Sequence, residues 1–557
     1  MSLGVAARIA ILFGIAAALR LAFLLATPDR AAPFTPLFKG DAALWLAWAQ
    51  SIQRGEPFAL ELGLPFRPPA TAWLLAWLWD GTHEGLLRAR VALALLGALI
   101  APATYLAARR VGERLALAAG GIVAVAQPSI VLAVTPCAET PYALLALLAV
   151  ALTARVATRP APLAALAMGA VHGVASLFRA EHALFAVLLA LLVVASRVRT
   201  KSRSCRVDLA AIAVGACVVL WPWQLHVHRT IDAFDARESP PCPSPAMRWD
   251  DAARARLAAV PGFARAATQR FVEATLAHRG VRAVDLAALD VVDEAFGSWP
   301  EPIGRSPFIA LYGPLNFALA NAPGSDGSFQ RALLDAPPRL AGGASRYDPR
   351  WLAGLPRDGE LSLEYPPHVE LVNHGVRVGL ASIVAAPGEA VTRTLEKLAI
   401  AWAGATPVLG ASALPLGPGG LRRRVDLCVG EGSGATLVRL AWLALVIHGA
   451  WRLRRRVEAW PFAAWLVAGA ATTVAFFGYA RLGALALPAL AVFAAAGCEG
   501  LPRRLVPRLG IALLACVFVA DARRVIAPPR YVVDGAAIDA IEPGPPLTQR
   551  PVRVELR

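Results

Sequence analysis

Charged residues are scarce in this chain of 557 residues. Asp, Glu, Lys and Arg make up only 17% of it, whereas soluble domains average about 25%. Hydrophobic residues make up 57%, and the mean hydropathy is +0.54. These values exclude an ordinary soluble enzyme. The net charge of +16 would suggest a nucleic-acid partner in a soluble chain, so the distribution of that charge has to be considered first.

Two sequence signatures are also missing. The seven cysteines are scattered without a CxxC pair, which excludes a zinc framework and a disulfide-rich scaffold. No glycine-rich loop of the nucleotide-binding type is present either. Any reaction that this chain catalyses therefore does not depend on a cysteine-based zinc site or a glycine-rich nucleotide loop.

Long apolar runs are abundant. A bilayer core about 30 Å thick requires roughly 20 apolar residues in each spanning helix. Runs of about this length predict ten spans, near residues 5–26, 86–108, 115–134, 139–157, 161–178, 181–196, 209–227, 434–451, 459–478 and 482–497. A weak run at 509–520 would be an eleventh, whereas 68–80 is too short to cross and is expected to be re-entrant or interfacial. The predicted fold is mainly α, a polytopic bundle with about 11 spans.

Arginine-rich connectors predict the orientation of this bundle in a cell membrane, either inner or plasma. Five connectors carry clustered basic residues, at 109–114, 155–159, 197–206, 452–456 and 503–508. The positive-inside rule places these connectors and the N-terminus in the cytoplasm, and the alternate connectors outside. Segment 228–433 has 21 basic and 22 acidic residues, so the whole positive excess lies in the membrane part. The excess reflects topology and anionic lipid, and no nucleic-acid partner is expected.

The sequence divides into four parts. Residues 1–227 form an N-terminal transmembrane module with a first external loop at 27–66, and residues 228–433 form one extracytoplasmic domain of α or mixed structure. C-terminal transmembrane helices follow at 434–521, and a tail at 522–557. Within the external domain, 376–404 has helical apolar spacing and predicts one helix along the membrane interface. Cys242 and Cys428 both fall in this domain, where an oxidising environment would allow a disulfide.

The first external loop carries two candidate functional residues. Asp41 stands before an apolar, aromatic helix, where partial desolvation would make its carboxylate a better base. Helix capping is an equally good interpretation of the same residue. Arg67 precedes Pro68 and Pro69 and would either contact a lipid phosphate or simply reach the headgroups. Lys39, two residues before Asp41, is a supporting candidate.

Other candidates lie at the expected external ends of later helices. In TPCAET, Glu139 begins a helix and, if buried, has to be paired, protonated or metal-bound. In FRAEH, Arg179 and Glu181 favour a structural ion pair beside His182. The remaining candidates are the weak metal pair His226 and His228, and Arg481, a cation near lipid phosphate level.

Taken together, these blocks resemble the GT-C superfold of membrane glycosyltransferases, specifically the bacterial relatives of protein O-mannosyltransferases and of lipid A aminoarabinose transferases. Their first loop has the pattern G-D-x-x-x-Y/W-x-x-x-A followed by R-P-P. The matching residues here are Gly40, Asp41, Trp45, Ala49 and Arg67-Pro68-Pro69. TPCAET, GVASLFRAEHALF, WPWQLHVHR and YARLGALALP resemble later blocks, with Ala180 in place of the usual proline. NFALANAPGSDG and EAVTRTLEKLAIAW resemble two external segments and include Asn316, Asn321 and Lys397.

The resemblance implies an enzyme that transfers a sugar, a hexose or pentose, from a polyprenyl phosphate to a lipid, glycan or protein on the outer side, with inversion. It implies Asp41 as base, Glu139 as a residue that orients the acceptor or holds a divalent cation, and Arg67, Lys397 and Arg481 as ligands of the donor phosphate. A lipid-linked donor also agrees with the lack of a nucleotide-binding glycine loop, because such a donor carries no nucleotide. A lipid or solute transporter, or a related scaffold without activity, is the alternative, although the two halves of the chain look dissimilar and most charges fall at helix ends.

Overall fold

The computed structural model describes residues 4–26, 41–56, 63–199, 205–237, 247–296, 299–304, 310–325, 327, 332–334, 361–407 and 433–499. Lys39, Cys242, Cys428 and the run 509–520 lie outside these ranges. The described residues are mainly α-helical, as the sequence predicts. The elements of the first half are α1 (Val5–Ala26), α2 (Asp41–Gln53), α3 (Ala70–Leu78), α4 (His83–Ala98), α5 (Ile100–Ala108), α6 (Glu113–Val125), α7 (Gln127–Val134), α8 (Glu139–Thr158), α9 (Pro162–Phe178), α10 (His182–Arg199) and α11 (Cys205–Asp235).

The second half continues the helical pattern, with one pair of short strands. Its elements are β1 (Arg248–Trp249), α12 (Asp251–Ala258), α13 (Gly262–His278), β2 (Ala283–Val284), α14 (Leu286–Phe296), α15 (Tyr312–Ala320), the 3₁₀ turn η3 (Ala332–Leu334), α17 (Pro366–Ala385), α18 (Pro387–Ala405), α20 (Ser433–Leu453), η6 (Val457–Ala459), α21 (Trp460–Ala475), α22 (Ala480–Leu485) and α23 (Leu487–Glu499). β1 and β2 pair in parallel, with Arg248 opposite Ala283 and Trp249 opposite Val284.

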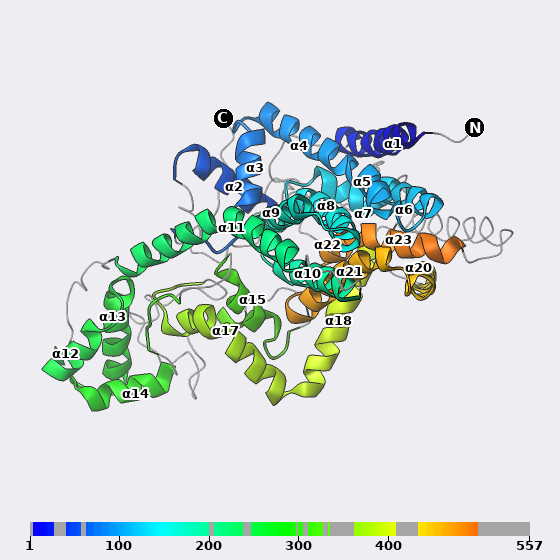
Figure 1. Ribbon diagram of the computed structural model, residues 1–557. Helices are drawn as coiled ribbons and strands as arrows, with labels where there is room; N and C mark the ends of the chain where they lie inside the picture. The colour runs from blue at the N-terminus through cyan, green and yellow to red at the C-terminus, as the bar shows by residue number, and fades with distance from the viewer. Residues whose placement is uncertain are drawn as a thin grey trace.

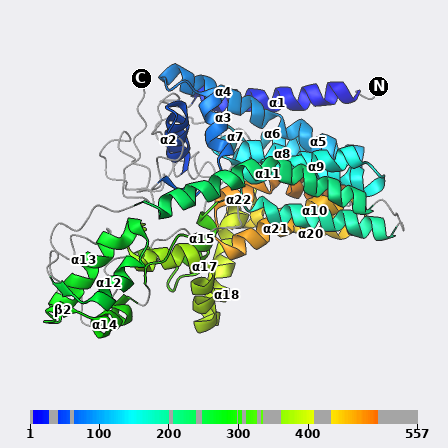
Figure 2. The same cartoon turned by 60° about the vertical axis from the view of Figure 1, so that its left-hand side comes forward.

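Most apolar helices form one bundle, and α12, α13 and α14 form a separate group at one end of it (Figure 1). The N-terminus of α1 lies at the opposite end, in Figure 2 as well. α11 connects the two parts. It continues to Asp235, past the expected domain boundary at residue 227, because no residue after Val227 interrupts its helical hydrogen bonding.

Five of the described helices are long and apolar enough to cross a membrane, or up to seven if each of two bent pairs counts as one span. The five are Val5–Leu25, Glu84–Ala108, Glu139–Thr158, Cys205–Asp235 and Thr436–Leu453. α9, α10 and α23 are shorter apolar helices. The nine residues of α3 reach about 14 Å, which agrees with the expectation that 68–80 does not cross.

The span expected at 115–134 is bent, and whether it crosses the membrane stays a prediction. α6 and α7 meet at Ala126 with a bend of 57°. Pro128, in the first turn of α7, has no N–H to donate to the preceding turn, so carbonyl groups at the end of α6 lose their helical partners. Arg20 of α1, fully buried, donates to the carbonyl oxygens of Ala124 at 3.1 Å and Val123 at 3.5 Å. An arginine from another helix thus stabilises the break.

The single interfacial helix expected at 376–404 is wrong, because α17 and α18 meet at 111°. Ala386 has φ −139° and ψ 69°, since the residue before a proline is disfavoured in the helical region. The two helices form a V beside the bundle (Figure 1). On α18, Arg393 and Lys397 are buried while Val391 and Leu395 are exposed. Val391 and Leu395 suit contact with lipid, and the exposed Glu396 beside them suits water, so α18 is amphipathic and its interfacial position stays a prediction.

Glycines allow a very close helix crossing in the bundle, that of α9 with α11. A Cβ atom on Gly169 would lie 2.0 Å from the carbonyl oxygen of Ile212, and one on Gly215 would lie 2.2 Å from that of Leu166. Small residues at such positions let two backbones approach within a membrane. The close contact of α9 with α11 therefore depends on glycine at both positions.

We expect Gly169→Val to separate α9 from α11 and to destabilise the protein by roughly 1–3 kcal/mol, the usual cost of overpacking. Thermal unfolding of the purified protein in detergent would measure this effect. Gly121→Val in α6 is the matched control, because a Cβ atom added there would meet no atom within 4 Å. Equal melting temperatures for the two variants would contradict the prediction.

Candidate active site

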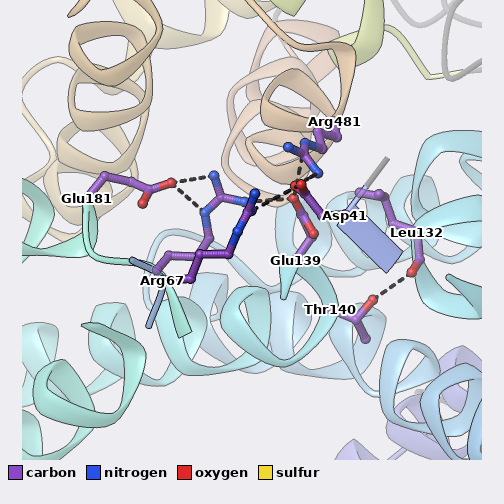
Figure 3. A network of polar contacts seen from close by, with 8 residues as sticks. Asp41, Arg67, Leu132, Glu139, Thr140, Glu181 and Arg481 are labelled. Carbon is purple, nitrogen blue, oxygen red and sulfur yellow. Dashed lines mark hydrogen bonds and ion pairs between the residues drawn. The ribbon is translucent and has the colours of Figure 1, made fainter. Parts of the chain in front are cut away.

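Six charged side chains converge where several helix ends meet. Figure 3 shows the carboxylates of Asp41 and Glu139 close together, with arginine side chains around them and Glu181 at one edge. The cluster contains three arginines and three carboxylates, so its formal charge is zero. Its members are Asp41, Arg67, Glu139, Arg179, Glu181 and Arg481.

Each oxygen of the Asp41 carboxylate accepts from a different arginine. Arg67 Nη1 lies 3.1 Å from Oδ1, and Arg481 Nη1 lies 2.7 Å from Oδ2. Burial alone would raise the pKa of Asp41, but attraction to Arg481 and then to Arg67 outweighs it and holds the pKa well below its usual range. Asp41 is therefore ionised at physiological pH, and both of its carboxylate oxygens form ion pairs with arginines.

Glu139 is the most buried carboxylate of the cluster, with a side-chain exposure of 2%. Its Oε1 accepts from Arg179 Nη1 at 2.7 Å and lies 3.6 Å from Arg481 Nε. Arg179 also pairs with Glu181, through Nε at 2.7 Å. The pairing that burial of Glu139 requires is thus present, and Arg481 connects the two acidic candidates to each other.

Local sequence explains why these groups point to one place. Asp41 and Glu139 are the first residues of α2 and α8, where the helix dipole favours a negative charge. Arg179 follows the last residue of α9, where a positive charge is favoured. The Thr140 hydroxyl donates to the Leu132 carbonyl oxygen at 3.0 Å and fixes the turn that presents Glu139 (Figure 3).

Aromatic rings contact two of the arginines in the cluster. The Arg67 guanidinium carbon lies 5.7 Å from the ring centroid of Trp45 and 5.0 Å from that of Tyr312. That of Arg481 lies 4.8 Å from the Tyr479 ring. Cation–π contacts of this kind orient guanidinium groups without using their N–H donors. Arg481 belongs to the short helix α22, although the sequence placed it in an external turn.

His182 belongs to a second, buried chain of polar groups. Its Nδ1 lies 3.1 Å from the Tyr142 hydroxyl, and its Nε2 lies 2.8 Å from His172 Nδ1. Tyr142 connects this chain to the cluster, because the Arg179 guanidinium lies 5.9 Å from its ring. Both ring nitrogens of His182 are thus used within the bundle, and it supports the site through Tyr142 rather than through the carboxylates.

Lys397 is fully buried, and its described hydrogen bonds go to groups outside the ion-pair cluster. Its Nζ donates to Asn321 Oδ1 and to the Val474 carbonyl oxygen, both at 3.1 Å. Asn321 in turn donates to the Ala475 carbonyl oxygen at 3.0 Å. These contacts connect α18 to the end of α21 and favour a structural use of Lys397; the phosphate-binding role stays a prediction. Asn316, on α15, has a buried Oδ1 that accepts no hydrogen bond from the described residues.

The metal candidates are not brought into the site. His226 stacks on Trp223 with ring centroids 5.2 Å apart, and its Nε2 lies 3.5 Å from the Thr230 hydroxyl. His228 lies two residues further along α11. Among the described residues, no three His, Cys, Asp or Glu side chains are grouped as metal ligands. Asp41 and Glu139 are already paired with arginines, so these residues do not fit a resident divalent cation.

Sequence reasoning missed Tyr142, His172 and Tyr312. Tyr142 follows Glu139 by three residues, a helical spacing that puts both on one face, so a signal was present. Tyr312 lies in segment 228–433, and its N–H donates to the Phe66 carbonyl oxygen at 3.2 Å. No local pattern predicts that contact, because it joins segments far apart in the chain.

Comparison with protein families supports the resemblance inferred from the motifs. The model of the family described as dolichyl-phosphate-mannose-protein mannosyltransferase matches residues 66–223, less than a third of the chain. The matched stretch includes Arg67, Glu139 and Arg179 of the cluster, and it excludes Asp41 and Arg481. No curated protein matches the chain.

Several solved structures have a low overall similarity. The Archaeoglobus fulgidus oligosaccharyltransferase with a tethered acceptor peptide is 12% identical at a TM-score of 0.39, covering 92% of this chain and 55% of its own. AglB from the same organism, with an inhibitory peptide and a dolichol-phosphate, is 14% identical at 0.38, with coverages of 92% and 55%. ArnT from Cupriavidus metallidurans, bound to undecaprenyl phosphate, is 16% identical at 0.32, with coverages of 93% and 88%. This chain spans about half the length of the archaeal proteins, and none of these likenesses assigns a residue role to it.

Proposed function

We propose that this chain is an integral-membrane glycosyltransferase that moves a sugar from a polyprenyl phosphate to a lipid, glycan or protein acceptor. The observation that carries the proposal is the Asp41 carboxylate held between Arg67 and Arg481, with Arg481 also paired to Glu139 at the start of a candidate membrane span. The family model over residues 66–223 supports the same donor class. The transfer would occur on the extracytoplasmic side of a cell membrane, with the N-terminus in the cytoplasm.

The chemistry requires one base and a set of cations. A glycosyl phosphate has a good leaving group, so the acceptor needs only to lose a proton while it attacks the anomeric carbon. Asp41 would take that proton, and a single displacement inverts the anomeric centre. Arg67 and Arg481 would stabilise the negative charge that develops on the phosphate. One guanidinium group can donate two parallel N–H hydrogen bonds to two phosphate oxygens.

Glu139, itself paired with Arg179, would hold Arg481 in place rather than react. Glu139 is almost completely buried and lies behind Arg481 and Arg179, so an acceptor reaches Asp41 more directly than Glu139. In the proposed site, Asp41 would accept the proton and Glu139 would position Arg481. Neither the reaction nor its charge balance requires a metal ion held by these residues.

The proposal is tested by mass analysis of envelope glycans and lipids from cells with and without the protein. We expect one hexose, pentose or amino-sugar substituent to disappear without the protein, and its mass and position would identify the sugar and acceptor. Purified protein should then transfer that sugar from its polyprenyl phosphate. Unchanged envelope composition, together with movement of a solute or lipid by the protein in vesicles, would favour a transporter instead.

A further inference from the structure

The ion pairs that hold Asp41 also oppose its proposed task. Both of its oxygens are bonded to arginines, and attraction to Arg481 and Arg67 keeps its pKa low. The efficiency of a general base falls as its pKa falls far below the working pH. In the arrangement described here, Asp41 is therefore a weak base, and activity requires a change in its surroundings.

Among the described groups that face Asp41, only loss of a positive charge from its side would raise its pKa. They are Arg67 before α3, Arg481 on α22, Tyr479 at the start of α22, and Glu139 across Arg481. Only the two arginines among them carry positive charge. They are also the cations assigned to the donor phosphate, so carboxylate and phosphate need the same two guanidinium groups.

The exposure of the cluster shows which ion pairs an incoming anion can reach. The Asp41, Arg67 and Arg481 side chains are 24%, 18% and 29% exposed, whereas Glu139 is 2% exposed. Arg481 is further held by Glu139 through Nε and by the Tyr479 ring, so its Nη1 can leave Asp41 without release of the whole side chain. The two arginines paired with Asp41 are more exposed than Arg179, which is 13% exposed, so an incoming anion reaches them more easily.

We propose that Arg67 and Arg481 are shared between Asp41 and the donor phosphate, so that phosphate binding draws them from the carboxylate and turns Asp41 into an effective base. This inference rests on the proposed function. It makes the two arginines a switch: without a donor they hold the base inactive, and with a donor they hold the leaving group. Asp41 would become basic only when a sugar phosphate is in place.

The charges balance through the transfer. The acceptor heteroatom bonds to the anomeric carbon and its proton moves to Asp41, while the bond from that carbon to the phosphate oxygen breaks and its electron pair stays on the phosphate. The donor phosphodiester carries one negative charge, and the polyprenyl phosphate product carries up to two, as its second pKa is about 6. Asp41 loses one negative charge as the phosphate gains one, so both arginines keep a charged partner throughout.

A binding measurement tests the sharing directly. We expect Asp41→Asn to bind a C55 polyprenyl monophosphate about tenfold more tightly than the wild type, because the arginines no longer have to leave a charged partner. Arg67→Gln should bind it more weakly. The matched control is Asp80→Asn, since Asp80 pairs with Arg88 outside the cluster, and its affinity should be unchanged. An unchanged or weaker affinity of Asp41→Asn would overturn the proposal.

A second measurement uses the wild-type chain, in case Asp41→Asn does not fold. Binding of the same lipid phosphate should raise the pKa of Asp41 as the arginines leave, so the infrared carbonyl band of its protonated acid should appear at a higher pH in the complex than in the free protein. The shift should also occur in Asp80→Asn, and no folded Asp41 variant should show it. Binding and sugar transfer without this shift would refute the switch alone, whereas absence of both binding and transfer would refute the proposed function itself.

Discussion

Sugar transfer should fall by roughly 10²–10⁴-fold when Asp41 is replaced by Asn, the usual contribution of a general base. Asn keeps the size of the side chain but cannot accept a proton from the acceptor. The arginines on either side of it remain, so the donor phosphate should still bind. The measurement is the initial rate of transfer from a purified polyprenyl-phosphate sugar to the acceptor, followed by mass spectrometry.

Asp80→Asn is again the control, because the Asp80 side chain is 47% exposed and its ion pair with Arg88 lies outside the cluster. Its rate should equal that of the wild type. Both variants should insert normally into membranes and elute as folded protein in detergent. A wild-type rate for Asp41→Asn would remove Asp41 from the role of base, even if the chain is a transferase.

Arg481→Met should abolish transfer and also destabilise the protein. Arg481 pairs with both Asp41 and Glu139. Removing one partner of a buried ion pair typically costs roughly 3–5 kcal/mol, because the remaining charge stays in a poorly solvated place. Since Arg67 and Arg179 remain, we expect the lower part of that range. Denaturant-induced unfolding in detergent would measure it.

A second substitution separates the two effects of Arg481→Met. Adding Glu139→Gln removes the buried charge and should recover much of the stability, but it cannot restore a cation for the phosphate, so transfer should stay lost. Arg88→Met, at an exposed ion pair, is the matched control and should change stability by less than about 0.5 kcal/mol. Recovery of transfer in the double variant would exclude Arg481 from the phosphate site.

Much of the membrane part was predictable, because hydropathy alone locates helices that need about 20 apolar residues. The errors occur at prolines. Pro128 and Pro387 interrupt apolar runs, and their missing N–H groups break the helices that composition would join. The number of spans stays a prediction, since five to seven of the described helices satisfy length and composition.

The members of the site were easier to predict than their contacts. Asp41, Glu139 and Arg179 were found because carboxylates and arginines at helix ends in an apolar chain are conspicuous. Their partners depend on which helix ends adjoin in space, which a single sequence does not reveal. Arg481, near the C-terminal end of the described helices, therefore emerged only from the structure as the residue that connects the two acidic candidates. The hydrogen bond from Lys397 to Asn321 is likewise a contact that the sequence does not predict.

α11 has a practical consequence for imaging. Its 31 residues make one helix of about 46 Å that begins in the bundle and ends beside the group formed by α12, α13 and α14. Small membrane proteins are difficult to align in electron micrographs because detergent hides their features. An antibody fragment bound to α12–α14 would lie near the far end of this long helix and would mark the orientation of each particle.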